Sequence, residues 1–245
     1  MSEGTYLDEH AEGSFTSRRK FLAGSAAALA GGALLAVPGV ASAHNPPNPP
    51  TDIDILNYAL TLERLEATFY RRVLERFNQR EFESAGIFDG LGAYVRRNVY
   101  ENFQRISRHE NTHVKTLVSI IRSLNGKPVP QSEYNFGITN VASVVRTARV
   151  LENTGVRAYD GAIAHISAAE YLTAGATIAT VEARHASYLN LLNKAVPFPS
   201  AFDKAVAPRT ICEDVQAFIT SSPKPYGPYR SLDRLCMRLP TTPTP

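Results

Sequence analysis

Apolar residues recur every three or four positions along four long stretches of the chain, which is the period of an amphipathic α-helix. We therefore predict four helices, over residues 52–78, 91–124, 140–165 and 168–196. Thr51 and Asn140 are of the type that caps helix N-termini, and Gly126 follows the second stretch as a stop signal. The pattern predicts an all-α fold.

The connection between the second and third helices is long enough to decide the topology. It holds about 15 residues, and at about 3.3 Å per residue it can run roughly 45 Å, the length of a helical bundle. We predict a four-helix bundle over residues 52–196 with this link as a long crossover between helices two and three.

Every predicted helix interrupts its own apolar seam with ionisable residues near its middle. Helices two and four each carry Glu-x-x-His, as "ENTH" and "EARH", and helices one and three each carry a glutamate followed seven residues later by a tyrosine, as "ERLEATFY" and "ENTGVRAY". The seam residues concerned are Glu63, Tyr70, Glu110, His113, Glu152, Tyr159, Glu182 and His185. The chain is thus an internal repeat of a Glu helix followed by a Glu-x-x-His helix.

Buried charges of this number need compensation. The effective penalty is several kcal/mol for each ion, and a domain with a net stability of about 5–15 kcal/mol does not tolerate six of them unpaired. Two divalent metal ions would balance four carboxylates, and two neutral imidazoles would complete the ligand set. A carboxylate-rich site with one histidine per ion suits iron or manganese better than zinc or copper.

These motifs resemble those of ferritin-like dimetal-carboxylate bundles, in which four helices supply Glu, Glu-x-x-His, Glu and Glu-x-x-His. A narrower resemblance is to secreted ferritin-like proteins of the desiccation- and stress-associated group. It is carried by the sequence of the first helix, "DILNYALTLERLEATFYRRVL", and by the N-terminal segment described below. The resemblance implies that Glu110 and Glu182 bridge two ions and that Tyr70 and Tyr159 are hydrogen-bond partners of the ligands. The full ligand set that it implies is Glu63, Glu110, His113, Glu152, Glu182 and His185.

Two positions near the seam depart from the repeat. Glu66 also faces the predicted core, as either an additional ligand or a carboxylate paired with an arginine, whereas its counterpart is Gly155. The glycine is expected to leave room beside the metals for a small oxidant. His109 neighbours Glu110 and is expected to point away from the seam into solvent. An alternative for the whole set is a core that kept its carboxylates and histidines as hydrogen-bonded pairs after losing the metals.

The N-terminal segment is predicted to be an export signal. Residues 1–43 contain "SRRKFL", a twin-arginine motif, followed by a Gly/Ala/Leu-rich stretch that ends in the small residues Ala41-Ser42-Ala43, a cleavage pattern. Residues 44–51 form a Pro-rich leader. We expect recognition by the twin-arginine translocase and a periplasmic or extracellular location.

Residues 197–245 are predicted to form an irregular C-terminal extension with one short helix at "ICEDVQAFI". Cys212 and Cys236 both lie there, and an oxidising compartment makes a disulfide plausible, with two separate buried thiols as the alternative. The pI is near 8.9, but the basic residues are dispersed without interleaved aromatics, so no nucleic-acid partner is expected. A homodimer is the default expectation for assembly.

The expected function is that of an exported dinuclear oxidoreductase of ferroxidase-like, peroxidase-like or catalase-like type. Dioxygen, peroxide or ferrous iron would be its substrate, and its role would be stress protection. The competing expectation is a non-catalytic stress or desiccation protein that buffers metal or uses the bundle as an interaction scaffold.

Overall fold

The computed structural model describes residues 49–243. The twin-arginine signal and the cleavage site predicted within residues 1–43 lie outside this range, as does most of the Pro-rich leader.

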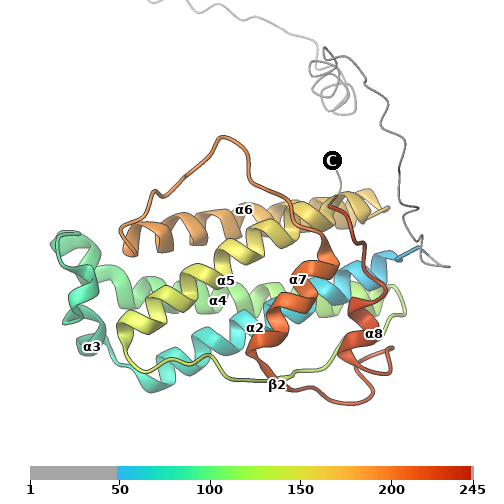
Figure 1. Ribbon diagram of the computed structural model, residues 1–245, viewed down its shortest axis with the longest axis horizontal. Helices are drawn as coiled ribbons and strands as arrows, with labels where there is room; N and C mark the ends of the chain where they lie inside the picture. Colours follow the sequence, from blue (N-terminus) through green and yellow to red (C-terminus); the bar gives the residue numbers. More distant parts are fainter. Residues whose placement is uncertain (1–48, 244–245) are drawn as a thin grey trace, which may run out of the picture. The chain divides into compact units, whose positions relative to one another are not determined.

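Four long helices form the bundle (Figure 1). They are α2 (Asp52–Arg76), α4 (Ala93–Ser123), α5 (Val141–Ala162) and α6 (Ala169–Leu192). Every end lies within four residues of its predicted position, and the turn η2 (Ile163–His165) continues α5. Helix α2 packs mainly on α4, and α5 mainly on α6, so the two halves of the sequence repeat are the two halves of the bundle.

Local sequence explains where two of these helices begin. The Thr51 hydroxyl accepts from the backbone N–H of Asp54, whose carboxylate accepts in return from Thr51, a capping box that satisfies two otherwise unpaired donors. Asn140 and Ser143 make the same reciprocal arrangement at the start of α5. The predicted caps therefore act as caps in the structure.

The link between α4 and α5 runs along α2, as the predicted crossover requires (Figure 1). Side chains spaced along α2 hold its backbone in order: the amide of Asn57 accepts from Val129 N–H at 2.8 Å, and Arg72 donates to the carbonyl of Tyr134 at 2.6 Å. Arg76 donates to the carbonyl of Ile138 at 2.7 Å. From position 57 to position 76 the helix rises about 28 Å, so the link spans most of its length.

The structure contains more short helices and strands outside the bundle than we predict from the sequence. The loop after α2 contains α3 (Gln79–Glu83) and the turn η1 (Gly86–Phe88). The C-terminal extension, expected to hold one short helix, contains α7 (Pro208–Asp214), the turn η3 (Val215–Phe218), strand β2 (Ile219–Ser221) and α8 (Leu232–Cys236). Strand β2 pairs antiparallel with β1 (Glu133–Tyr134) of the crossover link. The predicted short helix corresponds to α7 and η3, whereas β2 and α8 are additional to the prediction; through β2 the extension forms a cover attached to the link.

Side-chain contacts fix this cover to the start of α2. The Asp54 carboxylate accepts two hydrogen bonds from Arg238, at 3.0 and 2.8 Å, and one from the Tyr229 hydroxyl at 2.8 Å. Cys212 and Cys236 form a disulfide that joins α7 to α8, with a Cα–Cα distance of 5.5 Å. No helix within residues 49–243 has the length and apolar character needed to cross a membrane.

Candidate metal centre

The six predicted ligands meet in the middle of the bundle, one or two from each long helix. Glu63 lies on α2, Glu110 and His113 on α4, Glu152 on α5, and Glu182 and His185 on α6. All four carboxylate residues are 0 % exposed, whereas His113 and His185 retain 8 % and 6 % of their surface. The two imidazoles therefore lie nearer to solvent than the four carboxylates of this set.

Three carboxylates surround the inner ring nitrogen of His113. Its Nδ1 lies 3.2 Å from Oε2 of Glu63, 3.3 Å from Oε2 of Glu110 and 3.3 Å from Oε1 of Glu182. A single N–H can point at only one of these oxygens. Ligands at right angles around one ion, each about 2.1 Å from it, lie about 3 Å apart, so the spacing matches a coordination shell.

A second group forms around His185. Its Nδ1 lies 3.1 Å from Oε2 of Glu152, 3.2 Å from Oε1 of Glu110 and 3.9 Å from Oε1 of Glu182. Glu110 therefore turns one oxygen toward each histidine. Together with Glu182 it belongs to both groups of atoms that could hold an ion, each group lying within 4.8 Å. Glu110 and Glu182 are therefore the two residues that two ions, if bound, could share.

Some carboxylate oxygens in this cluster have no well-aligned donor. Glu110 Oε1 and both oxygens of Glu182 are buried without a well-aligned hydrogen-bond partner among the described residues, although Glu110 Oε1 lies 3.2 Å from Nδ1 of His185 and Glu182 Oε1 lies 3.3 Å from Nδ1 of His113. Leaving buried charged groups unsatisfied costs several kcal/mol. Two divalent cations between these oxygens would satisfy them, so the residues present fit the dimetal group predicted from the sequence.

The two tyrosines of the repeat bind across the bundle. Tyr70 on α2 donates its hydroxyl to Oε1 of Glu152 on α5, and Tyr159 on α5 donates to Oε1 of Glu63 on α2 at 2.6 Å. In both glutamates the other oxygen, Oε2, faces a histidine. Each tyrosine thus fixes one oxygen of a ligand and leaves the other free for an ion.

A fifth carboxylate lies beside this set. Glu66 is buried, and its Oε1 lies 3.3 Å from the place where a Cβ at position 155 would be. Oε2 of Glu182 lies 3.0 Å from the same point. The room expected beside Gly155 for a small oxidant is therefore taken up by these two carboxylates, because the missing side chain lets them approach the helix backbone.

Burial and mutual repulsion disfavour charge on Glu66, Glu110 and Glu182 and raise the pKa of each. Burial, followed by the neighbouring Glu182, raises the pKa of Glu66 well above its usual value, and burial also raises the pKa of Glu110 to about 7. Burial alone would lower the pKa values of the two histidines, but hydrogen bonds to the carboxylates outweigh this effect. They raise the pKa of His113 to about 12 and that of His185 to about 9. The cluster thus demands positive charge, from protons or from cations.

His109 makes a contact that we do not predict from the sequence. Its Nδ1 lies 2.9 Å from Nε2 of His185, and the two rings are 10° from parallel with centroids 5.2 Å apart. The side chain of His109 is exposed to solvent, as expected, but the expectation that it points away from the site is wrong, because its ring contacts the ring of His185. Position 109 is next to Glu110 but also one turn before His113, so it shares the flank of α4 from which His113 projects. The i, i+4 relation to His113 was the signal that could have revealed this.

Residues 51–195 match the ferritin-like domain. The chain belongs to the ferritin-like family. The match contains all four bundle helices and all six predicted ligands, and it ends before the C-terminal extension. No curated protein matches the chain.

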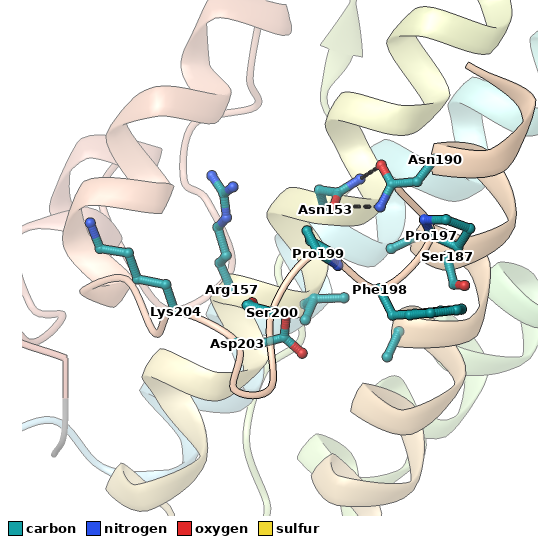
Figure 2. Close-up of a pocket in the computed structure, with 13 residues that line it drawn as sticks. Asn153, Arg157, Ser187, Asn190, Pro197, Phe198, Pro199, Ser200, Asp203 and Lys204 are labelled. Atoms are coloured by element: carbon teal, nitrogen blue, oxygen red, sulfur yellow. Dashed lines mark hydrogen bonds between the residues drawn. The ribbon is translucent and has the colours of Figure 1, made fainter. Parts of the chain in front are cut away.

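The ferritin-like bundle also has a surface cavity of about 220 Å³ between α5, α6 and the loop that follows α6 (Figure 2). Asn153 and Asn190 exchange hydrogen bonds of 3.1 and 3.3 Å across the α5–α6 seam at its wall. Ala183 and Ala186 also line it, and they are sequence neighbours of the ligands Glu182 and His185. None of the six ligands lines this cavity, so it is separate from the metal centre.

Proposed function

We propose that this protein is an exported dinuclear iron or manganese protein that acts as an oxidoreductase on dioxygen, peroxide or ferrous iron in stress protection. The observation that carries the proposal is the pair of overlapping ligand groups, in which Glu110 and Glu182 belong to both. Two ions held by these shared carboxylates would lie close enough to act on one small molecule together.

The donor set favours iron or manganese. Each group offers three carboxylates and one imidazole, and no thiolate takes part, because both cysteines are joined in the disulfide. Oxygen-rich sites with few imidazoles suit these metals better than copper or zinc. A bound pair of iron or manganese ions would supply a two-electron redox change at one place.

The chain's own residues prepare the site for that chemistry. The hydroxyls of Tyr70 and Tyr159 hold Glu152 and Glu63 in place. On α4, the buried apolar residues Ile106 and Leu117 flank the ligands, one turn before Glu110 and one turn after His113. Such a site excludes bulk water, which strengthens electrostatic interactions within it.

A non-catalytic role in metal buffering is the second candidate. The specific observation in its favour is that the four ligand carboxylates have no accessible surface. Storage tolerates slow exchange through a closed site, whereas turnover needs rapid access for a small substrate.

Metal analysis of the protein purified after native export tests the proposal. We expect about two iron or manganese ions per chain, and consumption of oxygen or peroxide by the loaded protein. Glu110→Ala and His113→Ala are expected to abolish both properties. Glu101→Ala is the matched control, because Glu101 is an exposed glutamate of the same helix whose partner is Arg105. Two bound ions without turnover would favour buffering, and a protein that binds no metal after correct loading would refute both functions.

The same variants give a second signature. Removing a buried carboxylate relieves repulsion within the cluster, so Glu110→Ala is expected to unfold at an equal or higher temperature than the wild type when both are metal-free. Loss of metal together with loss of stability would instead indicate that Glu110 has a structural role.

A further inference from the structure

The two ion positions of the repeat differ in what lies behind their histidines. Position 109, one turn before His113, is a histidine, whereas the corresponding position before His185 is Val181. The imidazole of His109 does not support its own helix's ligand: its Nδ1 contacts Nε2 of His185, on α6, at 2.9 Å. Only the position around His185 therefore has an imidazole behind its ligand in the described structure.

The chemistry of ligation fixes the direction of this hydrogen bond. His185 faces the carboxylates with Nδ1, and a ring nitrogen that binds a metal carries no proton. The proton of neutral His185 must then lie on Nε2 and point at His109. His109 accepts it with Nδ1 and keeps its own proton on Nε2. The nearly parallel rings, 10° apart, allow this N–H···N bond to set the orientation of His185.

We propose that His109 is a positioning residue that holds His185 in the tautomer and orientation needed for metal binding, and that it thereby makes the two ion positions unequal. The position formed by Glu110, Glu152, Glu182 and His185 binds its ion more tightly than the position formed with His113. This inference rests on the proposed dinuclear centre. Partners behind ligating histidines typically contribute 10–100-fold to metal affinity.

The α4–α6 seam offers a matched control. Asn102 lies seven residues before His109 on the same flank of α4 and donates to the Tyr188 hydroxyl of α6 at 3.1 Å. Asn102→Leu removes one hydrogen bond between the same two helices without touching a ligand. His109→Leu removes the acceptor behind His185, and His109→Asn keeps an acceptor oxygen at the place of Nδ1.

Titration of the full chain with Mn²⁺ tests the proposal when free Mn²⁺ is followed by electron paramagnetic resonance. The wild type and Asn102→Leu are expected to bind two ions with unequal affinities. His109→Leu is expected to bind the tighter of these ions about 10–100-fold more weakly, and His109→Asn to recover to within about threefold of the wild type. Unchanged binding of both ions by His109→Leu, or equal losses in the leucine and asparagine variants, would overturn the proposal while the dinuclear centre stands. A wild type that binds no Mn²⁺, Fe²⁺ or Zn²⁺ would overturn both.

A measurement on the unaltered protein guards against a variant that does not fold. Nitrogen-15 spectra of the histidine-labelled full chain, loaded with diamagnetic Zn²⁺, report which ring nitrogen carries the proton. We expect a metal-bound Nδ1 and a protonated Nε2 on His185, and an unprotonated Nδ1 on His109. A proton on Nδ1 of His109 would refute the inferred direction of the bond.

Discussion

Replacing Gly155 by alanine is expected to stabilise the fold and to weaken the metal centre at the same time. Gly155 lies inside helix α5, where a glycine is about 0.5–1 kcal/mol less favourable than alanine. The new Cβ would lie 3.0 Å from Oε2 of Glu182 and 3.3 Å from Oε1 of Glu66. Both atoms are ends of flexible side chains, so they can move aside without unfolding the helix.

The displacement is what weakens metal binding. Ordinary contact begins near 3.4 Å, so Oε2 of Glu182 must move by about 0.4 Å. Ligand distances in a well-formed metal site agree with ideal values to about 0.2 Å. Because Glu182 belongs to both ligand groups, the shift disturbs both ions. We expect affinity to fall about tenfold, the lower end of the effect of losing a ligand's support.

The assay is a metal-binding titration together with denaturant unfolding of the metal-free protein. Gly161→Ala on the same helix is the control of opposite sign. Its Cβ would lie 1.8 Å from the backbone oxygen of Val206, so the backbone of the C-terminal extension must move, and stability falls by more than about 1 kcal/mol while metal affinity stays near that of the wild type. Gly155→Ala protein that binds both ions normally, or that unfolds more easily than the wild type, would refute the reasoning.

Two further predictions concern the C-terminal cover. Replacing Cys212 and Cys236 by serine opens a loop with a sequence separation of 24, and the free energy of unfolding is expected to fall by about 3 kcal/mol; denaturant midpoints with and without reductant measure this, and equal midpoints would contradict it. Burial would raise the pKa of Asp54, but hydrogen bonds from Arg238, Thr51 and Tyr229 outweigh this effect and lower the pKa. The carboxylate therefore stabilises the fold above its unfolded pKa of about 3.9 and loses this effect as pH falls through the lower folded value. Asp54→Asn is expected to lose about 2 kcal/mol at pH 7 and to differ little from the wild type near pH 2, so an equal deficit at both pH values would count against the ion pair.

Helical periodicity is the reason why the bundle is predictable from the sequence. A step of three or four residues places Glu110 and His113 on one face whatever the rest of the chain does. The internal repeat then places Glu63 and Glu152 at equivalent positions, so the ligands predicted in one half of the sequence support those predicted in the other half. The crossover is predictable from the length of the link alone, because an extended link of about 15 residues can span the whole length of the bundle.

The cover and the partner of His185 depend on contacts that leave no local signal. Strand β2 pairs Ser221 with Glu133, and strands of two or three residues show no alternation of apolar and polar side chains. The contact of His109 with His185 depends on how closely α4 and α6 pack. A sequence pattern gives the face of a helix on which a residue lies, but not the depth at which the neighbouring helix meets it.

The departures from the repeat bear on the choice between the two candidate functions. A repeated Glu helix and Glu-x-x-His helix alone would give two equivalent ion positions, which is sufficient for buffering. The two halves of the repeat instead differ at two places. On the α2–α5 side, Glu66 lies opposite Gly155, its counterpart in the repeat. On the α4–α6 side, His109 contacts His185, whereas the counterpart of His109 in the repeat is Val181. A buried fifth carboxylate costs stability and adds nothing to storage in an already neutral site. Unequal ions with distinct surroundings are useful when one ion must change its ligands or charge while the other holds the centre together, and this favours the oxidoreductase.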